Sequence, residues 1–517
     1  MALRTSQSKN GTFITDKEVW SYADNSKNKG YPATEIAQTY DTNDYNTQTG
    51  HGHPVLTNAR VIGYGSLNDY NGYGSNVNLS GVSYRTWSNG GSVGWSAQPK
   101  PRVLAMERDF IVVGSPNLNR VDIFDAGYPI WHSNWPTGVA SGDTRSTQIA
   151  NCPNSKIPIT LTPPAGVDYN GGGSWQYFGK AVAIHNGRVV VGDYLMDGPN
   201  SSTQPKNGGF FIYDLQGNHI KTVREHTQGN PACGMGFQVA AGCGRIIASY
   251  STGTHTNKVV MFDIEGNYIG DIKSKGSTTP VEMGREGDMV IAENRIVIGD
   301  PYKAVVRIYD INGKGINELI GTQYQMWGRK IAVGCGRIAF GSNKGWGGSN
   351  LPGGVGNGNF AVRIFDLNGN PINVIDQDPI IGSAPQAFGS DIAIAHGYIF
   401  IGNEHAKSEA GNIYVYDLDG NWLQTVPPPQ TSGSGQQASD RFGSEIQVSH
   451  GRLLASAPTT GWGASNTGAT GSPPEMLYLW DILGHGTGEW TDPNNSNAGT
   501  EYEASRFHPT STFDLDI

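Results

Sequence analysis

The chain has 517 residues, a formal net charge of −9 and 10% aromatic residues. Its acidic balance argues against a nucleic-acid partner, because phosphate binding needs a basic face. No apolar stretch approaches ~18 residues, so no membrane insertion is expected, and the aromatic content argues against disorder.

Residues 1–97 form an N-terminal segment rich in Asn, Gly, Tyr and Ser, with few apolar runs. Short strands are expected at residues 12–14, 18–20 and 60–63. The first residues lack the apolar core and the cleavage site of a secretion signal, although the composition is typical of an extracellular adhesive surface. We therefore expect a role in anchoring or assembly for this segment.

One metal-binding pattern occurs in the N-terminal segment, at His51 and His53. His-x-His places two imidazoles on the same side of an extended strand, a geometry that can chelate a metal ion. Because the pattern occurs once, in a Gly- and Asn-rich context, an ordinary polar loop is the simpler interpretation.

Residues 98–484 repeat one sequence pattern. Its clearest copy begins with Phe178-Gly179, continues through two apolar strands, and reaches Tyr213-Asp214 before a Gln-Gly-Asn turn. In each copy an Asp closes the third strand: Asp125, Asp214, Asp263, Asp310, Asp366, Asp417 and Asp481. Most intervals between these Asp residues are roughly 47 to 64 residues, the spacing of propeller blades.

Each copy predicts four short strands, because its apolar residues alternate with period two and Gly-containing turns separate the runs. Gly accounts for 72 residues, about twice the usual share of ~7%, as expected for many turns and close sheet packing. A ring of such sheets buries their apolar faces against one another. The prediction is an all-β fold: a seven-bladed β-propeller of four-stranded antiparallel blades, preceded by an irregular N-terminal segment.

Three departures from the repeat complete the predicted domain organisation. An insertion of about residues 127–174 separates the first two copies, and residues 485–517 form a polar C-terminal tail. The seventh copy has a poor fourth strand after Trp480. Since propellers often close with a strand from the other terminus, we expect residues 59–62 to complete the seventh sheet.

The repeat resembles the FG-GAP-like propeller repeats of integrin α subunits and many bacterial proteins, on the pattern Phe-Gly-x-x-Val-Ala-Ile, Gly-Arg-Val-Val-Val-Gly and Ile-Tyr-Asp-Leu-x-Gly-Asn. It is also similar to repeats in virion structural and tail-fibre-like proteins of marine and cyanobacterial phages. This resemblance covers about residues 98–484 and implies the propeller fold and a virion context. Trimeric phage fibres sometimes bind iron through a His-x-His motif, so the resemblance also bears on His51 and His53.

One feature of the integrin-type repeats is absent. Their calcium loops have the form DxDxDG, and the nearest match, Asp417-Leu418-Asp419-Gly420-Asn421, sits where the other copies have a plain hairpin turn. No structural calcium and no cofactor are therefore expected.

No sequence motif for catalysis occurs in a convincing context. Asp288, Asp391 and Glu445 precede or begin the first strands of three copies and can line a central channel, either as a polar lining or as a catalytic carboxylate pair. A polar lining of the channel is the favoured interpretation. His185, His396 and His450 occupy the turn after that strand, and their repetition indicates a structural role.

The four cysteines, Cys152, Cys233, Cys243 and Cys335, are too few to cross-link a chain of this size. Cys243 and Cys335 occupy the same place in different copies, so they lie far apart in a ring and are expected to be free thiols. The one pairing left to test is Cys233 with Cys243.

Two tryptophans lie in long Gly-rich connections between second and third strands, Trp346 in the fifth copy and Trp462 in the seventh. Connections of one type emerge on one face of a propeller, so both are expected to share a face. There they can stack on a sugar or contact a protein. The alternative is that each folds back onto its own blade.

Together these features predict a non-enzymatic bacteriophage virion protein, tail- or fibre-associated or decorating the head. It would be made in the host cytoplasm and become extracellular on release. The expected partners are other virion proteins, copies of itself and a host-surface glycan. The alternatives are a secreted lectin or adhesin and a polysaccharide-degrading enzyme on the same scaffold.

Overall fold

The computed structural model describes fourteen stretches of the chain: residues 60–65, 102–125, 159–164, 178–196, 208–224, 234–251, 257–283, 287–322, 327–342, 361–375, 388–406, 411–426, 442–457 and 475–482. Residues 109, 117, 118, 195 and 405, which fall within these stretches, are not described. Within the described residues no helix is long and apolar enough to cross a lipid bilayer.

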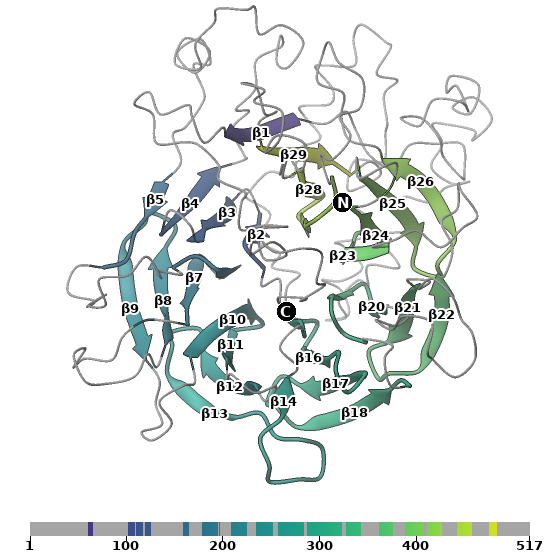
Figure 1. The fold of residues 1–517 in the computed structure, drawn as a ribbon, viewed down its shortest axis with the longest axis horizontal. Helices are drawn as coiled ribbons and strands as arrows, with labels where there is room; N and C mark the ends of the chain where they lie inside the picture. The colour runs from purple at the N-terminus through teal and green to yellow at the C-terminus, as the bar shows by residue number, and fades with distance from the viewer. Residues whose placement is uncertain are drawn as a thin grey trace, which may run out of the picture.

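The described strands form seven antiparallel sheets arranged as a ring (Figure 1). The first three blades contain β2 (Leu104–Glu107), β3 (Phe110–Ser115), β4 (Arg120–Asp125) and β5 (Ile159–Leu161); β6 (Ala181–His185), β7 (Arg188–Asp193), β8 (Gly209–Asp214) and β9 (His219–Arg224); and β10 (Gly234–Gly242), β11 (Arg245–Ser251), β12 (Asn257–Asp263) and β13 (Tyr268–Asp271), with β14 (Glu282–Met283) also paired to β12.

Blades 4 to 7 follow the same order from the centre outward. They contain β15 (Met289–Ala292), β16 (Arg295–Asp300), β17 (Val305–Asp310) and β18 (Gly315–Ile320); β19 (Ile331–Gly334), β20 (Arg337–Ser342), β21 (Ala361–Asp366) and β22 (Pro371–Ile375); β23 (Phe388–Ala395), β24 (Tyr398–Asn403), β25 (Asn412–Asp417) and β26 (Trp422–Val426); and β27 (Ile446–Ser449), β28 (Arg452–Ala457), β29 (Glu475–Asp481) and β1 (Arg60–Gly65). The predicted seven-bladed β-propeller is confirmed.

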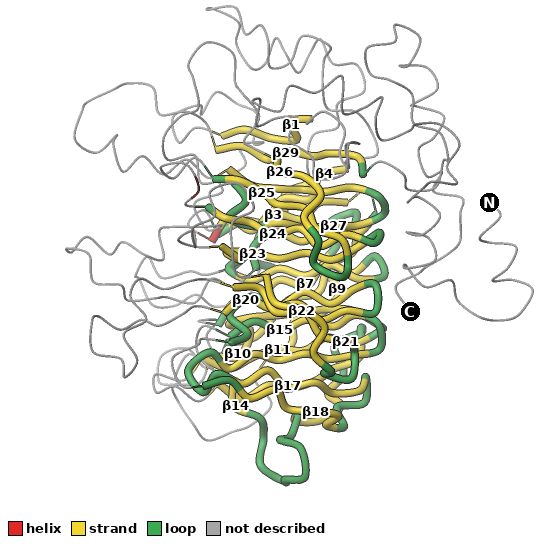
Figure 2. The backbone as a smooth tube through the Cα atoms, turned by 90° about the vertical axis from the view of Figure 1, so that its right-hand side faces the viewer, coloured by secondary structure: helices red, strands yellow, loops and turns green. Residues whose placement is uncertain are grey.

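The ring has two different faces. Short turns join the first strand to the second and, in blades 2 to 6, the third to the fourth, and they lie along one face, which we call the hairpin face (Figure 2). The connections from second to third strand and from blade to blade leave the opposite face, which we call the loop face. Each inner strand therefore begins at the loop face and ends at the hairpin face.

Burial follows position within a blade. The second strands are covered on both sides by neighbouring blades, so β7 is buried at every position after Arg188 and reads as a continuous apolar run. Outer strands such as β9 are half exposed. The outer strand therefore forms the solvent-exposed edge of its blade.

The repeated Asp at the end of the third strand forms the hairpin turn. Asp214 Oδ1 accepts hydrogen bonds from the backbone N–H groups of Gln216 (2.9 Å) and Asn218 (2.8 Å), and Oδ2 accepts one from Asn218 Nδ2 (2.8 Å). The same three bonds recur at Asp263, Asp366 and Asp417. This confirms a turn-forming role for the repeated Asp, and the segment beginning at Asp417 is one of these hairpins.

The Phe-Gly pairs that open several copies lie where neighbouring blades approach most closely. Gly443 of blade 7 has φ +81°, which side-chain-bearing residues rarely adopt, and its carbonyl oxygen touches Gly402 of blade 6 so closely that a Cβ on Gly402 would overlap it. The preceding Phe442 is fully buried and packs 5.7 Å from the Trp480 ring. The same contact occurs between Gly114 and Gly179, Gly192 and Gly236, Gly299 and Gly328, and Gly341 and Gly389.

Replacing Gly402 by Ala should lower the free energy of unfolding by about 2 to 3 kcal/mol, because the new methyl group separates two packed backbones. Chemical denaturation measures this. Gly270→Ala is the matched control: its Cβ meets nothing within 4 Å, and the expected change is below about 0.5 kcal/mol. Equal effects of the two substitutions would contradict the close-approach explanation.

The N-terminal strand closes the ring. β1 pairs antiparallel with β29 from Arg60↔Leu479 to Gly65↔Glu475 and is the outermost strand of blade 7. The closing strand expected at residues 59–62 therefore corresponds to β1. In blade 1, β5 pairs with β4 and lies inside the segment 127–174 that the sequence analysis assigns to an insertion. The fourth strand of the blade thus divides that segment.

Candidate functional site

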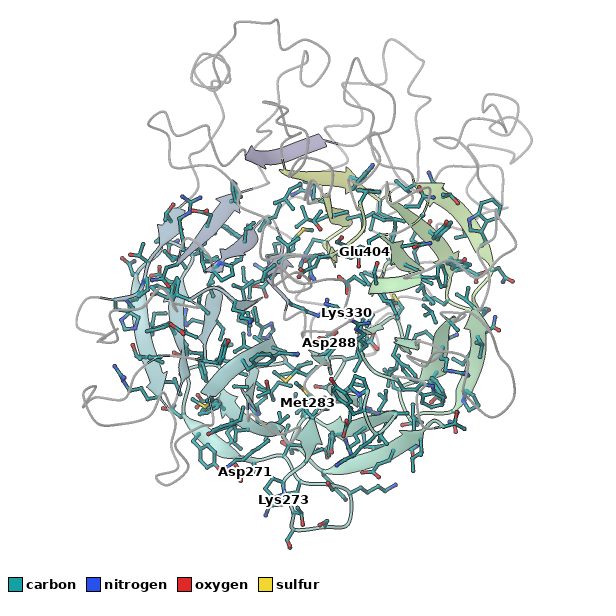
Figure 3. The ribbon with its side chains drawn as sticks, viewed as in Figure 1. Asp271, Lys273, Met283, Asp288, Lys330 and Glu404 are labelled. Carbon is teal, nitrogen blue, oxygen red and sulfur yellow. The ribbon has the colours of Figure 1, made fainter. Side chains whose placement is uncertain are left out.

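The seven inner strands enclose a central channel with a cavity of ≈ 320 Å³, and each of them contributes lining residues. The middle of the channel is lined mainly by small side chains: Ala105, Ala183, Ala240, Ala332 and Ala393. In blades 4 and 7 the equivalent positions carry Val290 and Gln447. Figure 3 shows Asp288, Lys330 and Glu404 near the centre of the ring.

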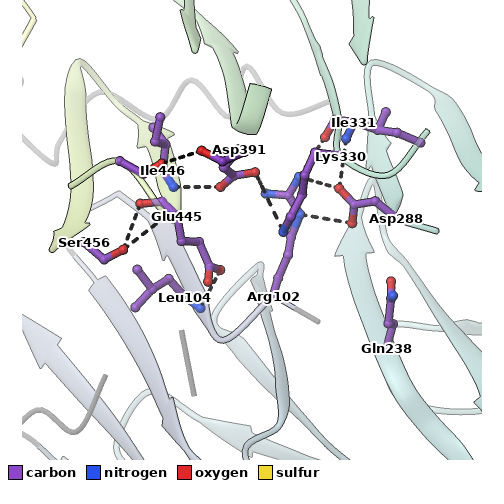
Figure 4. Close-up of polar contacts among 12 residues, drawn as sticks. Arg102, Leu104, Gln238, Asp288, Lys330, Ile331, Asp391, Glu445, Ile446 and Ser456 are labelled. Carbon is purple, nitrogen blue, oxygen red and sulfur yellow. Dashed lines mark hydrogen bonds and ion pairs between the residues drawn. The ribbon is translucent and has the colours of Figure 1, made fainter. Parts of the chain in front are cut away.

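Three buried carboxylates, Asp288, Asp391 and Glu445, lie beside Arg102 at the loop-face end of the inner strands. The sequence analysis expected them to line the channel, but of these four residues only Arg102 lines the cavity. Each carboxylate accepts a hydrogen bond from the first backbone N–H of the next inner strand. The donors are Ile331 for Asp288 (3.0 Å), Ile446 for Asp391 (2.7 Å) and Leu104 for Glu445 (2.9 Å). These carboxylates therefore join successive blades (Figure 4).

Arg102 of blade 1 reaches across the ring to this cluster. Its Nη2 lies 2.7 Å from both Asp288 Oδ2 and the Ile331 carbonyl oxygen, and Nη1 lies 3.6 Å from Asp391 Oδ1. The guanidinium thus contacts blades 4, 5 and 6, and the Arg102 carbonyl oxygen accepts a hydrogen bond from Val182 N–H of blade 2 (2.8 Å). One residue thus links five blades (Figure 4).

The charges of this cluster stabilise one another. Burial opposes ionisation of Asp288, but the Arg102 guanidinium outweighs it, so the pKa of Asp288 lies below its usual range. Burial also opposes the charge on Arg102, yet Asp288 and Asp391 raise its pKa above the usual range. Both groups are therefore ionised at neutral pH.

Glu445 behaves differently. Burial raises its pKa to about 7; Lys330 opposes this rise, and the neighbouring Asp391 carboxylate adds to it. The folded state thus favours the protonated acid more than the unfolded state does. The stability due to this group is fully present below pH 4.5 and is lost as the pH rises through about 7.

Glu445→Gln should remove this loss. The amide oxygen can still accept the Leu104 N–H bond, but no charge is buried at high pH. The variant should resemble the wild type near pH 4.5 and be more stable by about 2 to 3 kcal/mol at pH 8. The free energy of unfolding of both proteins is measured at several pH values. Burial also raises the pKa of Asp122 to about 6, but both proteins contain Asp122, so its contribution cancels in their difference. A difference independent of pH would contradict the assignment.

The hairpin-face end of the channel is surrounded by turns that are linked from blade to blade. A side chain near the end of one inner strand accepts a hydrogen bond from a backbone N–H in the turn of the next blade. The pairs are Glu107 with Asn186 (2.8 Å), His185 with Gly244 (3.0 Å), Glu293 with Gly336 (2.9 Å), Cys335 with Gly397 (3.3 Å), His396 with Gly451 (2.7 Å) and Ser449 with Arg108 (3.0 Å).

These contacts explain the repeated histidines. His185 and His396 accept through Nε2, so that nitrogen carries no proton in either case. His450 Nδ1 lies 2.8 Å from Ser449 Oγ. All three lie at the hairpin-face end of the channel and make structural contacts, as the repetition indicated.

The cysteine predictions are met in part. Neither Cys243 nor Cys335 is in a disulfide bond, and both occupy a turn position with positive φ. Cys152 and Cys233 lie outside the described residues. The pairing of Cys233 with Cys243 is not supported, because Cys243 is not in a disulfide bond.

The other candidate residues lie outside the part of the chain that the structure describes. These are the surface tryptophans Trp346 and Trp462 and the metal candidates His51 and His53. Within the described residues no group of three or more His, Cys, Asp or Glu side chains can hold a metal ion.

Sequence reasoning missed the two cations of the loop-face cluster. Lys330 of blade 5 occupies the repeat position that Asp288 holds in blade 4 and Asp391 in blade 6. Aligning the copies with one another would have identified it. Arg102 lies one position earlier, before the first inner strand. Its partners are on the far side of the ring, and no local pattern identifies it.

No protein-family model matches this chain, and no curated protein sequence matches it. Two solved structures with a similar fold are U3-55K and the quinohemoprotein alcohol dehydrogenase ADHIIG from Pseudomonas putida HK5. Both have 12% sequence identity and a TM-score of 0.40. The aligned region covers 72% of this chain and 92% of U3-55K, and 75% of this chain and 67% of the dehydrogenase. The propeller fold occurs in enzymes and in proteins without catalytic activity.

Proposed function

We propose that this protein is a non-enzymatic structural component of a bacteriophage virion. In this role the propeller is a rigid ring that presents its loop face to a neighbouring virion protein, to another copy of itself or to a host-surface glycan. The virion context rests on the resemblance to phage repeats inferred from the sequence pattern of residues 98–484, and no family model or curated protein sequence matches the chain.

The observation that carries the presenting role is the difference between the two faces. On the hairpin face most connections are short and repeat from blade to blade. On the loop face the chain runs from β16 to β17 through residues 301–304, but from β20 to β21 through 343–360 and from β28 to β29 through 458–474. Variable connections on one side of a rigid ring are typical of a recognition surface.

The channel carboxylates support the non-enzymatic part of the proposal. Asp288, Asp391 and Glu445 each accept a backbone N–H from the next blade, and Arg102 binds Asp288 and lies beside Asp391. A carboxylate pair committed to joining blades is poorly placed to accept a substrate proton. Trp346 and Trp462 remain the candidates for stacking on a sugar or contacting a protein.

Electron microscopy of purified particles, labelled with an antibody against the propeller, tests the proposal. The expected result is labelling at fixed, symmetric positions on the particle. A protein found only in the soluble fraction would overturn the virion assignment.

A second experiment separates the two alternatives. The isolated protein is incubated with bacterial and algal polysaccharides, and both binding and the release of reducing ends are measured. Binding that Trp346→Ala or Trp462→Ala weakens, without new reducing ends, supports glycan recognition. Release of reducing ends indicates the polysaccharide-degrading enzyme.

A further inference from the structure

We propose that the outer rim of blade 5 is a contact between two copies of this chain, in which β22 of one copy pairs antiparallel with β22 of the other. The contact lies on the rim of the ring, away from the loop face, and does not depend on the proposed function. It follows from the exposure of β22, from its lack of charge and from the backbone groups on its free edge.

β22 is the outermost strand of its blade and lies on the outside of the ring (Figure 1). Among the described residues it pairs only with β21. Residues 371–374 are exposed, and the exposed fractions of the two largest apolar side chains are 37% for Ile372 and 42% for Val374. Both side chains point to the same face of the sheet, because they are two positions apart. The strand thus presents an apolar pair beside an uncovered backbone edge.

The outer strands differ in charge, and β22 has no charged residue. The charged residues of the others are Arg60 in β1, Lys221 and Arg224 in β9, Asp271 in β13 and Glu318 in β18. In a two-fold antiparallel pair a strand meets its own copy, so a charged strand brings charges of the same sign together, which is destabilising. β26 is also uncharged, but it is buried except at its first residue, and β5 has only three residues. Among the described outer strands β22 therefore fits a second copy of itself best.

The backbone of β22 specifies the register of the pair. The Val374 N–H donates to Asn373 Oδ1 (2.8 Å), so this N–H lies on the free edge. By the alternation of an antiparallel strand, the backbone groups of Ile372 lie there as well. A pair centred on Asn373 sets Ile372 of each copy opposite Val374 of the other, and each of these two residue pairs exchanges two N–H···O=C bonds. In each copy the Val374 N–H exchanges its local bond to Asn373 for a bond to the second copy.

The same register covers the exposed apolar side chains. Ile372 and Val374 become cross-strand neighbours, and pairs of β-branched residues stabilise a sheet. On the other face Asn373 Nδ2 keeps its bond to the Asp419 carbonyl oxygen (2.6 Å). A contact along one five-residue strand is smaller than a standard interface of about 1,200 to 2,000 Å². We therefore expect weak, reversible pairing at high protein concentration.

Analytical ultracentrifugation of the full chain up to millimolar concentration tests the proposal. The wild type should associate reversibly, and Ile372→Lys should weaken this association at least about tenfold, because a charge on the edge opposes strand pairing. Ile220→Lys is the matched control: it makes the same substitution on the outer strand of blade 2, where Ile220 is 40% exposed, and should leave association unchanged. A wild type that stays monomeric, or association that Ile372→Lys does not weaken, would overturn the proposal.

Disulfide trapping tests the register. Asn373→Cys places the two introduced cysteines opposite each other, with their Cα atoms about 4.5 Å apart, as in a non-hydrogen-bonded pair, and a disulfide can span this distance. Oxidation should therefore yield a covalent dimer on a non-reducing gel. Ile220→Cys, which retains the same four native cysteines, should yield none. Equal amounts of covalent dimer from the two variants would contradict the pairing.

A second trap does not alter Asn373. Ile372→Cys and Val374→Cys are prepared separately and then mixed, because these two positions face each other in the proposed contact. The mixture should yield more covalent dimer than either variant alone. If neither Asn373→Cys nor the mixture forms a covalent dimer, β22 does not pair with its copy and the proposal fails.

Discussion

Replacing Arg102 by Gln should lower the free energy of unfolding by about 3 to 4 kcal/mol. The substitution removes a guanidinium with 16% of its side chain exposed from two carboxylates with 6% and 0% exposed. Asp288 and Asp391 then remain buried without their principal counter-charge, and removing one partner of a buried ion pair is strongly destabilising. Denaturant unfolding at pH 7 measures the effect.

An exposed arginine on the same ring is the matched control. Arg188 pairs with Glu265 at 3.2 Å, but 31% of its side chain and 51% of that of Glu265 are exposed. Arg188→Gln should therefore cost at most about 1 kcal/mol. The double variant Arg102→Gln with Asp391→Asn should lose less free energy of unfolding than the sum of the losses in the two single variants. The reason is that the second substitution removes a carboxylate that has lost its partner. Equal costs for Arg102 and Arg188 would show that the cross-ring contact does not hold the blades together.

The blade pattern could be predicted from sequence because its signals act locally. Asp214 and its equivalents form their turns with residues two and four positions later, so the contact is encoded within one hairpin. The Phe-Gly pairs are equally visible in the sequence. Their physical reason is not, because the close approach of Gly402 to Gly443 depends on the neighbouring blade.

The charged cluster marks the limit of this reasoning. The positions of Asp288, Asp391 and Glu445 in the repeat predicted that they face the channel. That each carboxylate accepts an N–H from the next blade follows only from how blades stack. The contact of Arg102 with Asp288 joins residues 186 positions apart in the chain, and no periodic pattern specifies such a partner.

Blade 1 shows a different limit. Its fourth strand, β5, spans only Ile159–Leu161, and Pro158 and Pro163 flank it. A run this short with prolines on both sides is weak evidence for a strand, and blade 1 also lacks the Asp-x-x-Gly-Asn turn that precedes the fourth strand in other blades. The strand is specified by its pairing with β4 and by the burial of Leu161 between blades 1 and 2.

Removing β1 should open the ring. A protein that begins at residue 66 lacks the strand whose five paired residues cover the outer edge of β29, and each lost backbone hydrogen bond costs about 0.5 to 1.5 kcal/mol. We expect a loss of about 3 to 5 kcal/mol in the free energy of unfolding. We also expect concentration-dependent association, because the uncovered edge of β29 can pair with a strand of another chain. Denaturant unfolding and light scattering measure the two effects.

A protein that begins at residue 58 is the control for this truncation, because the two proteins differ only by the strand and two residues before it. It should unfold at the same denaturant concentration as the full chain and remain monodisperse to the same extent. A synthetic peptide of residues 58–66, added to the shorter protein, should restore part of the lost stability by occupying the same edge in trans. If both truncated proteins are equally stable, the ring holds through the inner contacts of Arg102 and the carboxylates alone, and β1 contributes nothing to its closure.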